Sequence, residues 1–197
     1  MTSSPITLPS LIRGDLVRLV PAELWMAPRF AAWMNEPDTV HLMGGIAYPI
    51  SLAAEEDWVR TRLEPSWDDG VFLAIEAIAG PEAVVIGTIE LRHLNAETRR
   101  GEVGILIGEP AYRGGGYGTE AIALLCGFAF AELGLQRIEL STSEFNTRAV
   151  RAYEKVGFGL EGRQRRRTHI AGRYYDVLLM GLLREEFRGA PPRGPRP

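Results

Sequence analysis

The stretch Arg113-Gly114-Gly115-Gly116-Tyr117-Gly118-Thr119-Glu120 does most to decide how this chain folds and what it binds. It lies between an expected strand over 101–108 and an expected buried helix that begins near Gly118. Glycines adopt positive φ at no steric cost and let successive N–H groups point into one concavity, to which a helix N-terminus adds partial positive charge. The stretch therefore predicts a phosphate or pyrophosphate site, to which the Arg113 side chain can add a contact.

Three specific interpretations of these glycines compete. A nucleotide P-loop needs a lysine directly after the glycines, and the sequence has none there. The dinucleotide fingerprint G-x-G-x-x-G/A is matched by Gly116, Gly118 and Ala121, with Glu139 near the acidic spacing. However, the stretch lies far from the N-terminus, and no second βαβ unit follows. The third interpretation depends on a second segment of the chain, and a glycine-rich turn that binds nothing is the plain alternative to all three.

Composition predicts one mixed domain. The 197 residues are 46% hydrophobic and 24% charged, which suffices for one globular core. We expect an irregular lead over 1–12, a single domain over 13–187, and a disordered tail over 188–197 that is rich in proline, glycine and arginine. Because antiparallel strands come first along the chain, the pattern favours an α+β fold over a doubly wound sheet.

Apolar periodicity and turn residues predict the elements of this domain. Helices are expected over 22–34, 52–63 and 147–156, in addition to the one that runs from near Gly118 to Gly134. Strands are expected over 16–20, 71–78, 84–91, 101–108 and 138–143, with a final hairpin over 158–167 and 173–183. Glu36-Pro37-Asp38 is expected to break the first helix, and Ser51 to cap the second.

Charge, cysteine and histidine content bear on partners and location. There are 22 basic and 25 acidic residues, and the net charge of −3 argues against a nucleic-acid partner. The single cysteine, Cys126, excludes an internal disulfide and a cysteine zinc site, and the three histidines are scattered, so we expect no metal. We find no secretory signal, and the apolar run over 121–131 is shorter than the roughly 20 residues of a membrane span. We therefore expect a cytoplasmic protein without membrane contact.

Two clusters of side chains each allow two interpretations. The basic cluster near the last hairpin is typical of a solvated face, or of a contact with an acidic protein or RNA; its members are Arg163, Arg165, Arg166, Arg167 and Arg173. The tryptophans of the first 70 residues belong either to the core or to the wall of a substrate pocket; they are Trp25, Trp33, Trp58 and Trp67.

A second segment makes the glycine-rich stretch more specific. Arg113-x-x-Gly116-x-Gly118 resembles the [QR]-x-x-G-x-[GA] motif of the GNAT superfamily of N-acetyltransferases. About 28 residues later, the segment over 146–158 resembles the N-x-R-A-x-x-x-Y-x-K-x-G-F pattern of the same family. Three further matches are similar to its RimJ/RimL-like branch, whose named members acetylate ribosomal-protein N-termini: Gly87 before Ile89-Glu90-Leu91, Glu102-Val103-Gly104-Ile105, and Gly172-x-Tyr174-x-Asp176. The resemblance implies the GNAT fold, a mixed and mostly antiparallel sheet flanked by helices.

The resemblance also implies acetyl-CoA as co-substrate and assigns roles to particular residues. The pyrophosphate would be held by backbone N–H groups of Gly114, Gly115, Gly116, Tyr117, Gly118 and Thr119. The pantetheine arm would pair, as an added strand does, with the edge of Leu106, Ile107 and Gly108. Asn146 would contact the coenzyme, and its place before 147–156 also suits a helix N-cap. Tyr153 would donate a hydrogen bond to the sulfur, although its spacing alone favours a core tyrosine.

Acetyl transfer to an amine also needs the amine to lose a proton. We expect Glu102 to be the general base, with Glu90 or a water molecule as the alternatives. Cys126 lies in the middle of an apolar helix, so we expect direct transfer in a ternary complex instead of an acyl-enzyme. The resemblance implies a protein N-terminus as acceptor. A small amine of the polyamine, aminoglycoside or amino-acid type, a longer acyl donor, a homodimer, and a non-catalytic acyl-CoA-binding domain all stay open.

Overall fold

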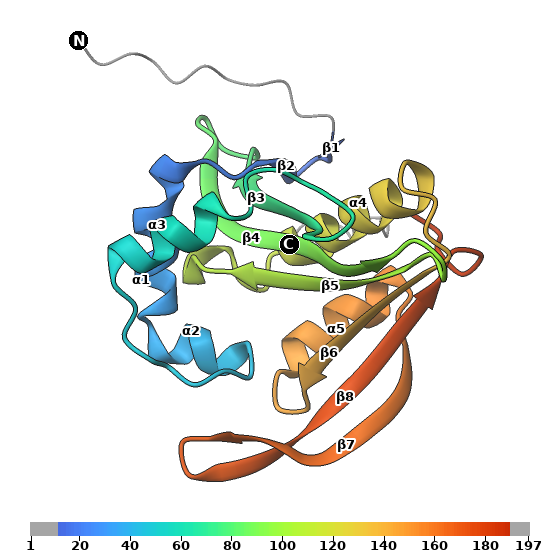
Figure 1. Cartoon of the computed structure of the whole chain (residues 1–197). Helices are drawn as coiled ribbons and strands as arrows, with labels where there is room; N and C mark the ends of the chain where they lie inside the picture. Colours follow the sequence, from blue (N-terminus) through green and yellow to red (C-terminus); the bar gives the residue numbers. More distant parts are fainter. Residues whose placement is uncertain (1–11, 190–197) are drawn as a thin grey trace.

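The computed structural model describes residues 12–189 and folds them around one twisted sheet with helices on its sides (Figure 1). Of the expected lead, only Ile12 falls within this range, and it belongs to the short strand β1 (Ile12–Arg13), where it pairs with Leu19. Residues 1–11 and 190–197, which include most of the expected tail, lie outside the described residues.

The elements follow the expected order. The strands are β2 (Val17–Pro21), β3 (Val71–Ala77), β4 (Val84–Asn95), β5 (Arg100–Ile107), β6 (Arg137–Ser143), β7 (Gly159–Ile170) and β8 (Arg173–Leu183). The α-helices are α1 (Ala27–Met34), α2 (Pro37–Leu42), α3 (Leu52–Arg60), α4 (Tyr117–Ala131) and α5 (Thr147–Val156), and the short 3₁₀ helices are η1 (Leu24–Met26) and η2 (Pro110–Tyr112). The predicted helix over 147–156 and the Ser51 cap, whose Oγ accepts from the N–H of Ala54 at 3.1 Å, are confirmed.

The sheet confirms the predicted α+β class. Its strand order within the described residues is β1-β2-β3-β4-β5-β6-β8-β7. Neighbouring strands are antiparallel throughout, except that β5 and β6 are parallel. The parallel pairing covers only Arg100–Glu102 of β5 opposite Arg137–Glu139 of β6. Beyond Glu102 the two strands separate, and this separation creates the opening that the rest of the molecule surrounds.

The helix that follows the glycine-rich stretch forms the centre of the core. No charged residue occurs between Glu120 and Glu132, so α4 can be buried on most sides. Ala121, Ile122 and Leu125 are each at most 1% exposed and pack against the sheet. A second buried cluster joins α1, α3 and β3 on the other side of the opening.

Two prolines change the expected helices of the N-terminal part. The helix expected over 22–34 is divided into η1 and α1, because Pro28 lies in the first turn of α1, where its missing N–H is tolerated. Glu36-Pro37-Asp38 does end that helix, but Pro37 then occupies the first turn of a helix that the sequence analysis missed, α2. Strand β4 continues to Asn95, beyond the expected end at Leu91, through an irregular pairing with β5.

Candidate active site

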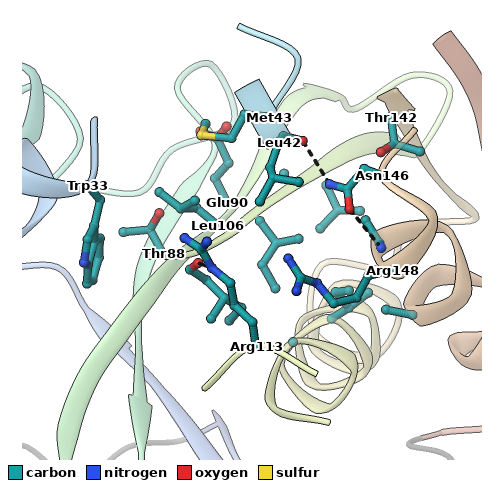
Figure 2. Close-up of a pocket in the computed structure, with 18 of the residues that line it drawn as sticks. Trp33, Leu42, Met43, Thr88, Glu90, Leu106, Arg113, Thr142, Asn146 and Arg148 are labelled. Carbon is teal, nitrogen blue, oxygen red and sulfur yellow. Dashed lines mark hydrogen bonds between the residues drawn. The ribbon is translucent and has the colours of Figure 1, made fainter. Parts of the chain in front are cut away.

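A cavity of about 1000 Å³ occupies the opening between β5 and β6. Residues of the N-terminal helices α1 and α3 form one of its walls, and residues of α4 and α5 form the opposite wall. Figure 2 shows Trp33 of α1 and Arg148 of α5 on opposite sides of it. Between them lie consecutive residues of β5, from Val103 to Ile107, and Ser141 and Thr142 of β6. These stretches of β5 and β6 are not paired with each other, so their facing edges are free to bind a ligand's polar groups.

The glycine-rich stretch places a helix N-terminus at the cavity. Gly114 has φ +87° and Gly116, the N-cap of α4, has φ +90°, a backbone region that favours glycine. The first N–H of this turn with an acceptor inside the helix belongs to Glu120, which donates to the oxygen of Gly116. Within the described residues, the earlier N–H groups have no recorded acceptor. They are therefore available to an anion.

The predicted binding residues of this stretch do not all reach the cavity. Gly114, Gly116, Gly118 and Thr119 line it, together with Leu106 and Ile107 of β5. Gly115 and Tyr117 are outside the lining, since the ring of Tyr117 packs against Tyr112 with centroids 5.1 Å apart. Gly108 is buried under the indole of Trp33 and also lies outside the lining.

Arg113 is bonded mainly to the protein itself. Its Nε donates to the carbonyl oxygen of Ile107 at 2.9 Å, and its Nη2 donates to Gly108 O and to Thr39 Oγ1, both at 2.9 Å. Burial lowers the pKa of its guanidinium, and the nearby charge of Arg148 acts in the same direction. These bonds connect the end of β5 to the glycine-rich stretch and to α2. The observed role of the Arg113 side chain is therefore to position these three segments relative to one another.

Helix α5 contributes cations that the sequence analysis missed. Arg148, Arg151 and Lys155 line the cavity, and no ion pair to any of them is found among the described residues. Their spacing of three and four residues puts them on one face of a helix, a signal that was readable from the sequence. Together with the free N–H groups of the glycine-rich stretch, they form a donor set that fits a coenzyme carrying several phosphates.

Asn146 closes the N-terminus of α5 and reaches across to α2. Its Oδ1 accepts from the N–H of Ala149 at 3.2 Å, which confirms the predicted N-cap. Its Nδ2 donates to the carbonyl oxygen of Leu42 at 2.9 Å (Figure 2). The side chain lines the cavity, so a further contact with a ligand is compatible with both bonds.

Tyr153 lies on α5 between the core and the cavity. Its side chain is only 6% exposed and packs edge-on against Phe158, yet the residue lines the cavity. No hydrogen bond to its hydroxyl is found among the described residues. Burial raises the pKa of Tyr153 to about 12, and the positive charge of Arg92 offsets only part of this effect. The hydroxyl therefore stays protonated and can donate to a ligand.

Glu90 and Glu102, the two glutamates that the sequence predicts as candidates for the general base, differ in whether they line the cavity. Glu90 lines the cavity, and a Cβ built on Gly104 would lie 2.9 Å from its Oε1. Glu102 is outside the lining, because it belongs to the part of β5 that is still paired with β6. Its Oε1 accepts from Arg92 at 2.7 Å. Burial acts to raise the pKa of Glu102, but its bonds with Arg92 and His93 outweigh burial and lower it.

An aromatic wall and a buried carboxylate complete the lining. The rings of Phe30, Trp33, Phe72 and Trp58 form a continuous series, with Trp58 and Phe72 centroids 4.9 Å apart. Glu55 of α3 lies in the same lining and is only 5% exposed. Its place in the first turn of a helix suggested nothing more than a favourable interaction with the helix dipole. Trp25 and Trp67 lie outside the lining.

Other candidate groups lie away from the cavity or make structural contacts. In the basic cluster, Arg163 donates to Glu144 and Asp176, two carboxylates that only the tertiary structure brings to it. Cys126 is fully buried in α4, and burial raises the pKa of its thiol. Across residues 12–189 there is no group of three or more metal-ligating side chains. Over the same range, no helix is long and apolar enough to cross a membrane.

Comparisons with known proteins agree with this geometry. A family model described as an acetyltransferase (GNAT) domain matches residues 17–159. The SPbeta prophage-derived uncharacterized N-acetyltransferase YokL of Bacillus subtilis is 33% identical over 147 residues, which is 74% of this chain and 78% of that protein. The putative ribosomal N-acetyltransferase YdaF of the same organism is 29% identical over 135 residues, 68% of this chain and 73% of its own length.

A solved structure shares the fold. It is the crystal structure of spermidine N-acetyltransferase from Vibrio cholerae in complex with CoA and spermine, with a TM-score of 0.78 and 24% identity. The alignment covers 88% of this chain and 98% of that one.

Proposed function

This chain belongs to the GNAT family of N-acetyltransferases, and from that premise we propose that it moves the acetyl group of acetyl-CoA directly to the N-terminal amine of a protein. The observation that carries the proposal is the cavity where β5 and β6 separate. Free N–H groups of the glycine-rich stretch and the cations of α5 line one wall of it, and aromatic rings and Glu55 line the opposite wall. An anionic coenzyme and an amine can therefore enter the same cavity from opposite walls.

The coenzyme side of the proposal uses backbone donors and cations. The N–H groups at Gly114, Gly116, Gly118 and Thr119 would bind the pyrophosphate, and the cationic face of α5 would bind the remaining phosphate charge. The unpaired edge of β5 from Val103 to Ile107 would pair with the amides of the pantetheine arm. An N–H group of the same edge would stabilise the negative charge that develops on the thioester oxygen.

Tyr153 is proposed to stabilise the departing thiolate by a hydrogen bond. A thiol has a pKa of about 8.5. With the pKa of Tyr153 at about 12, full transfer of its proton to the thiolate would be uphill by roughly 5 kcal/mol. Donation without transfer avoids this cost and still lowers the energy of the anion. The buried thiol of Cys126 offers no accessible nucleophile, which supports direct transfer in a ternary complex.

Proton removal from the amine is proposed to involve Glu90 in place of Glu102. Glu90 lines the cavity beside Gly104, where the edge of β5 is open. Glu102 is the cross-strand partner of Arg92, two pairs along the strands from Glu90, and it binds Arg92, which in turn contacts Glu90 at 2.5 Å. Glu102 therefore acts in this proposal as a positioning residue, and Glu90 accepts the proton directly or through a water molecule.

The names of the similar proteins give different acceptors for the acetyl group. A protein N-terminus agrees with the YdaF relative, whose name describes a putative ribosomal N-acetyltransferase. A small amine is the second candidate, because the structure with the shared fold is named for spermidine acetylation. We place the protein in the cytoplasm, where its single buried thiol stays reduced.

The test combines coenzyme binding with turnover. Thermal unfolding is followed with acetyl-CoA, CoA and NADH, since a ligand at 100 times its Kd adds about 2.7 kcal/mol of stability. Thiol release from acetyl-CoA is then measured with peptides that carry a free α-amine, with the same peptides blocked at that amine, and with spermidine. Stabilisation by both CoA forms, with turnover of free peptides alone, supports the proposal. Binding without turnover of any amine would refute it.

A further inference from the structure

Glu55 is a buried carboxylate without a partner. Its side chain belongs to α3, is 5% exposed, and lines the cavity on the aromatic wall. No hydrogen bond or ion pair from a described residue reaches its carboxylate. The other carboxylate of the lining, Glu90, is contacted by Arg92 at 2.5 Å and by Arg62 at 3.3 Å. Among the described residues the fully buried side-chain N and O atoms without a partner are Arg62 Nε and Arg92 Nε, so the Glu55 oxygens still reach the cavity. A cation that enters the cavity can therefore pair with them.

The surroundings of Glu55 are suited to an ammonium group on an apolar body. Phe30, Trp33, Trp58 and Phe72 line the same wall of the cavity. Aromatic faces attract ammonium groups and also bury hydrocarbon, so they bind both parts of an apolar amine. Ala54 and Ile50 add aliphatic surface to this wall. A cation that reaches Glu55 therefore arrives with its carbon skeleton against rings and methyl groups.

The charges of the whole lining limit how many cations the acceptor can carry. The lining contains two carboxylates, Glu55 and Glu90, and five cations, which are Arg92, Arg113, Arg148, Arg151 and Lys155. Glu90, the proposed proton acceptor, already faces two guanidinium groups, so Glu55 is the carboxylate of the lining that has no cationic partner among the described residues. A second or third ammonium group on the same acceptor would find no other carboxylate in the lining without a guanidinium partner, and near Glu90 it would meet the guanidinium groups of Arg62 and Arg92. Like charges in a partly buried site repel each other and disfavour binding.

We propose that Glu55 determines acceptor specificity by binding the ammonium group of a primary amine that carries a single positive charge on an apolar body. The inference rests on the proposed function and narrows its substrate class. The α-amine of a chain with an apolar first residue belongs to this class, and so does an arylalkylamine. Polyamines such as spermidine fall outside it, because they bring several charges to one free carboxylate.

The first experiment measures binding without catalysis. Titration calorimetry is carried out on the full chain saturated with CoA, with three probes: phenethylamine, a tripeptide amide with an N-terminal leucine, and spermidine. The variants are Glu55→Gln, which keeps the shape and removes the charge, and Glu56→Gln. Glu56 is the next residue of α3 and lies outside the lining, so it is the matched control.

We expect only the Glu55→Gln variant to lose affinity for the monocationic probes. Glu55→Gln lowers the affinity for the monocationic probes by about tenfold or more, since hydrogen bonds to charged groups are worth more than neutral ones. Glu56→Gln binds as the unmodified protein does, and CoA affinity is unchanged in both. Spermidine binds less tightly than the better of the two monocationic probes. The inference is overturned if Glu55→Gln binds these probes normally, if neither probe binds, or if spermidine binds most tightly.

Turnover separates this inference from the proposed function. Thiol release is measured with the same probes at saturating acetyl-CoA, and Glu55→Gln is expected to raise KM much more than it lowers kcat. The tripeptide and phenethylamine arms decide which member of the class is used. If the probes bind in a Glu55-dependent way but no thiol is released, the proposed function fails while the assignment of Glu55 stands. If the unmodified protein and Glu55→Gln release thiol at equal rates at every acceptor concentration, the assignment of Glu55 fails.

Discussion

The indole ring of Trp33 lies directly on the backbone of Gly108. A Cβ atom built on Gly108 would come within 2.0 Å of the ring, and the Trp33 Nε1 donates to Glu109 Oε1 at 3.2 Å. The contact joins α1, which carries part of the aromatic wall, to the end of the strand that lines the cavity. The absence of a side chain at position 108 therefore serves the placement of Trp33.

Substitution Gly108→Ala should destabilise the protein and disturb the acceptor wall. The added methyl group must displace the ring, and overpacking of this kind costs about 1–3 kcal/mol. We expect a lower melting temperature and a raised KM for the acceptor, with nearly unchanged acetyl-CoA affinity. Gly159→Ala is the control, because no atom lies within 4 Å of a Cβ there. A selective loss of acetyl-CoA affinity would show that Gly108 contacts the coenzyme.

Substitution Gly116→Ala should weaken acetyl-CoA binding by about tenfold or more, because the N–H groups at the start of α4 depend on a φ of +90°. Gly134→Ala provides a matched control, since Gly134 has φ +66° and lies outside the lining. Both variants carry backbone strain, so both should lose stability. Calorimetry with acetyl-CoA distinguishes them, and equal affinities would refute the assignment of the glycine-rich stretch.

Substitution Arg151→Ala should lower CoA affinity in a salt-dependent manner. Arg151 lines the cavity without an ion-pair partner among the described residues, so its charge is available to a phosphate. The difference in CoA affinity between Arg151→Ala and the unmodified protein should become smaller as ionic strength rises, because salt screens partly exposed charges. Arg173→Ala removes an exposed arginine at the β7–β8 turn and should bind CoA normally. Identical salt dependence in the two variants would exclude a phosphate contact for Arg151.

Substitution Tyr153→Phe should lower kcat while leaving acetyl-CoA affinity almost unchanged. The hydroxyl has a pKa of about 12, so it remains a hydrogen-bond donor throughout the range from about pH 7 to pH 10. We therefore expect no loss of activity in this range that depends on Tyr153. The pH profile of kcat checks the point: an alkaline fall in the unmodified enzyme that disappears in Tyr153→Phe would show that the hydroxyl ionises earlier.

Substitution Glu55→Gln should stabilise the folded protein at neutral pH. Burial raises the pKa of Glu55, so the folded state disfavours the ionised form. Above the folded-state pKa this cost is present in full, and below the unfolded pKa of about 4.3 both states are protonated and the cost disappears. The increase in the free energy of unfolding that Glu55→Gln produces should therefore become smaller as pH falls. Denaturant unfolding at several pH values tests this, with Glu56→Gln as the control.

Local sequence was sufficient for most of the fold. Glycines and an uncharged run predicted the start and the burial of α4, and Asn146 and Gly157 predicted both ends of α5. These features act through neighbours a few residues apart, so they are readable without the tertiary structure. Helix α2 was missed because a proline that ends one helix also suits the first turn of the next.

Which side chains line the cavity depends on pairing between strands that are far apart in the sequence. Glu90 and Glu102 both lie on strands and both carry a carboxylate, so the sequence could not rank their access to the opening. The parallel pairing of β5 with β6 ends at Glu102, which stays outside the lining, whereas Glu90 of β4 lies opposite Gly104, in the unpaired part of β5, and lines the cavity. Likewise, the bonds of Arg113 to strand carbonyls and to Thr39 join segments 74 residues apart.

The sequence by itself determined the family and the α+β class and predicted a phosphate site at one helix start, because each depends on residues that are near one another in the chain. Only the tertiary structure decided which charges face the acceptor. Glu55 resembles any acidic residue in a first helical turn until α3 packs beside β3 and turns it toward the aromatic wall. Burial and missing partners are properties of packing between distant segments, and local sequence carries no record of them.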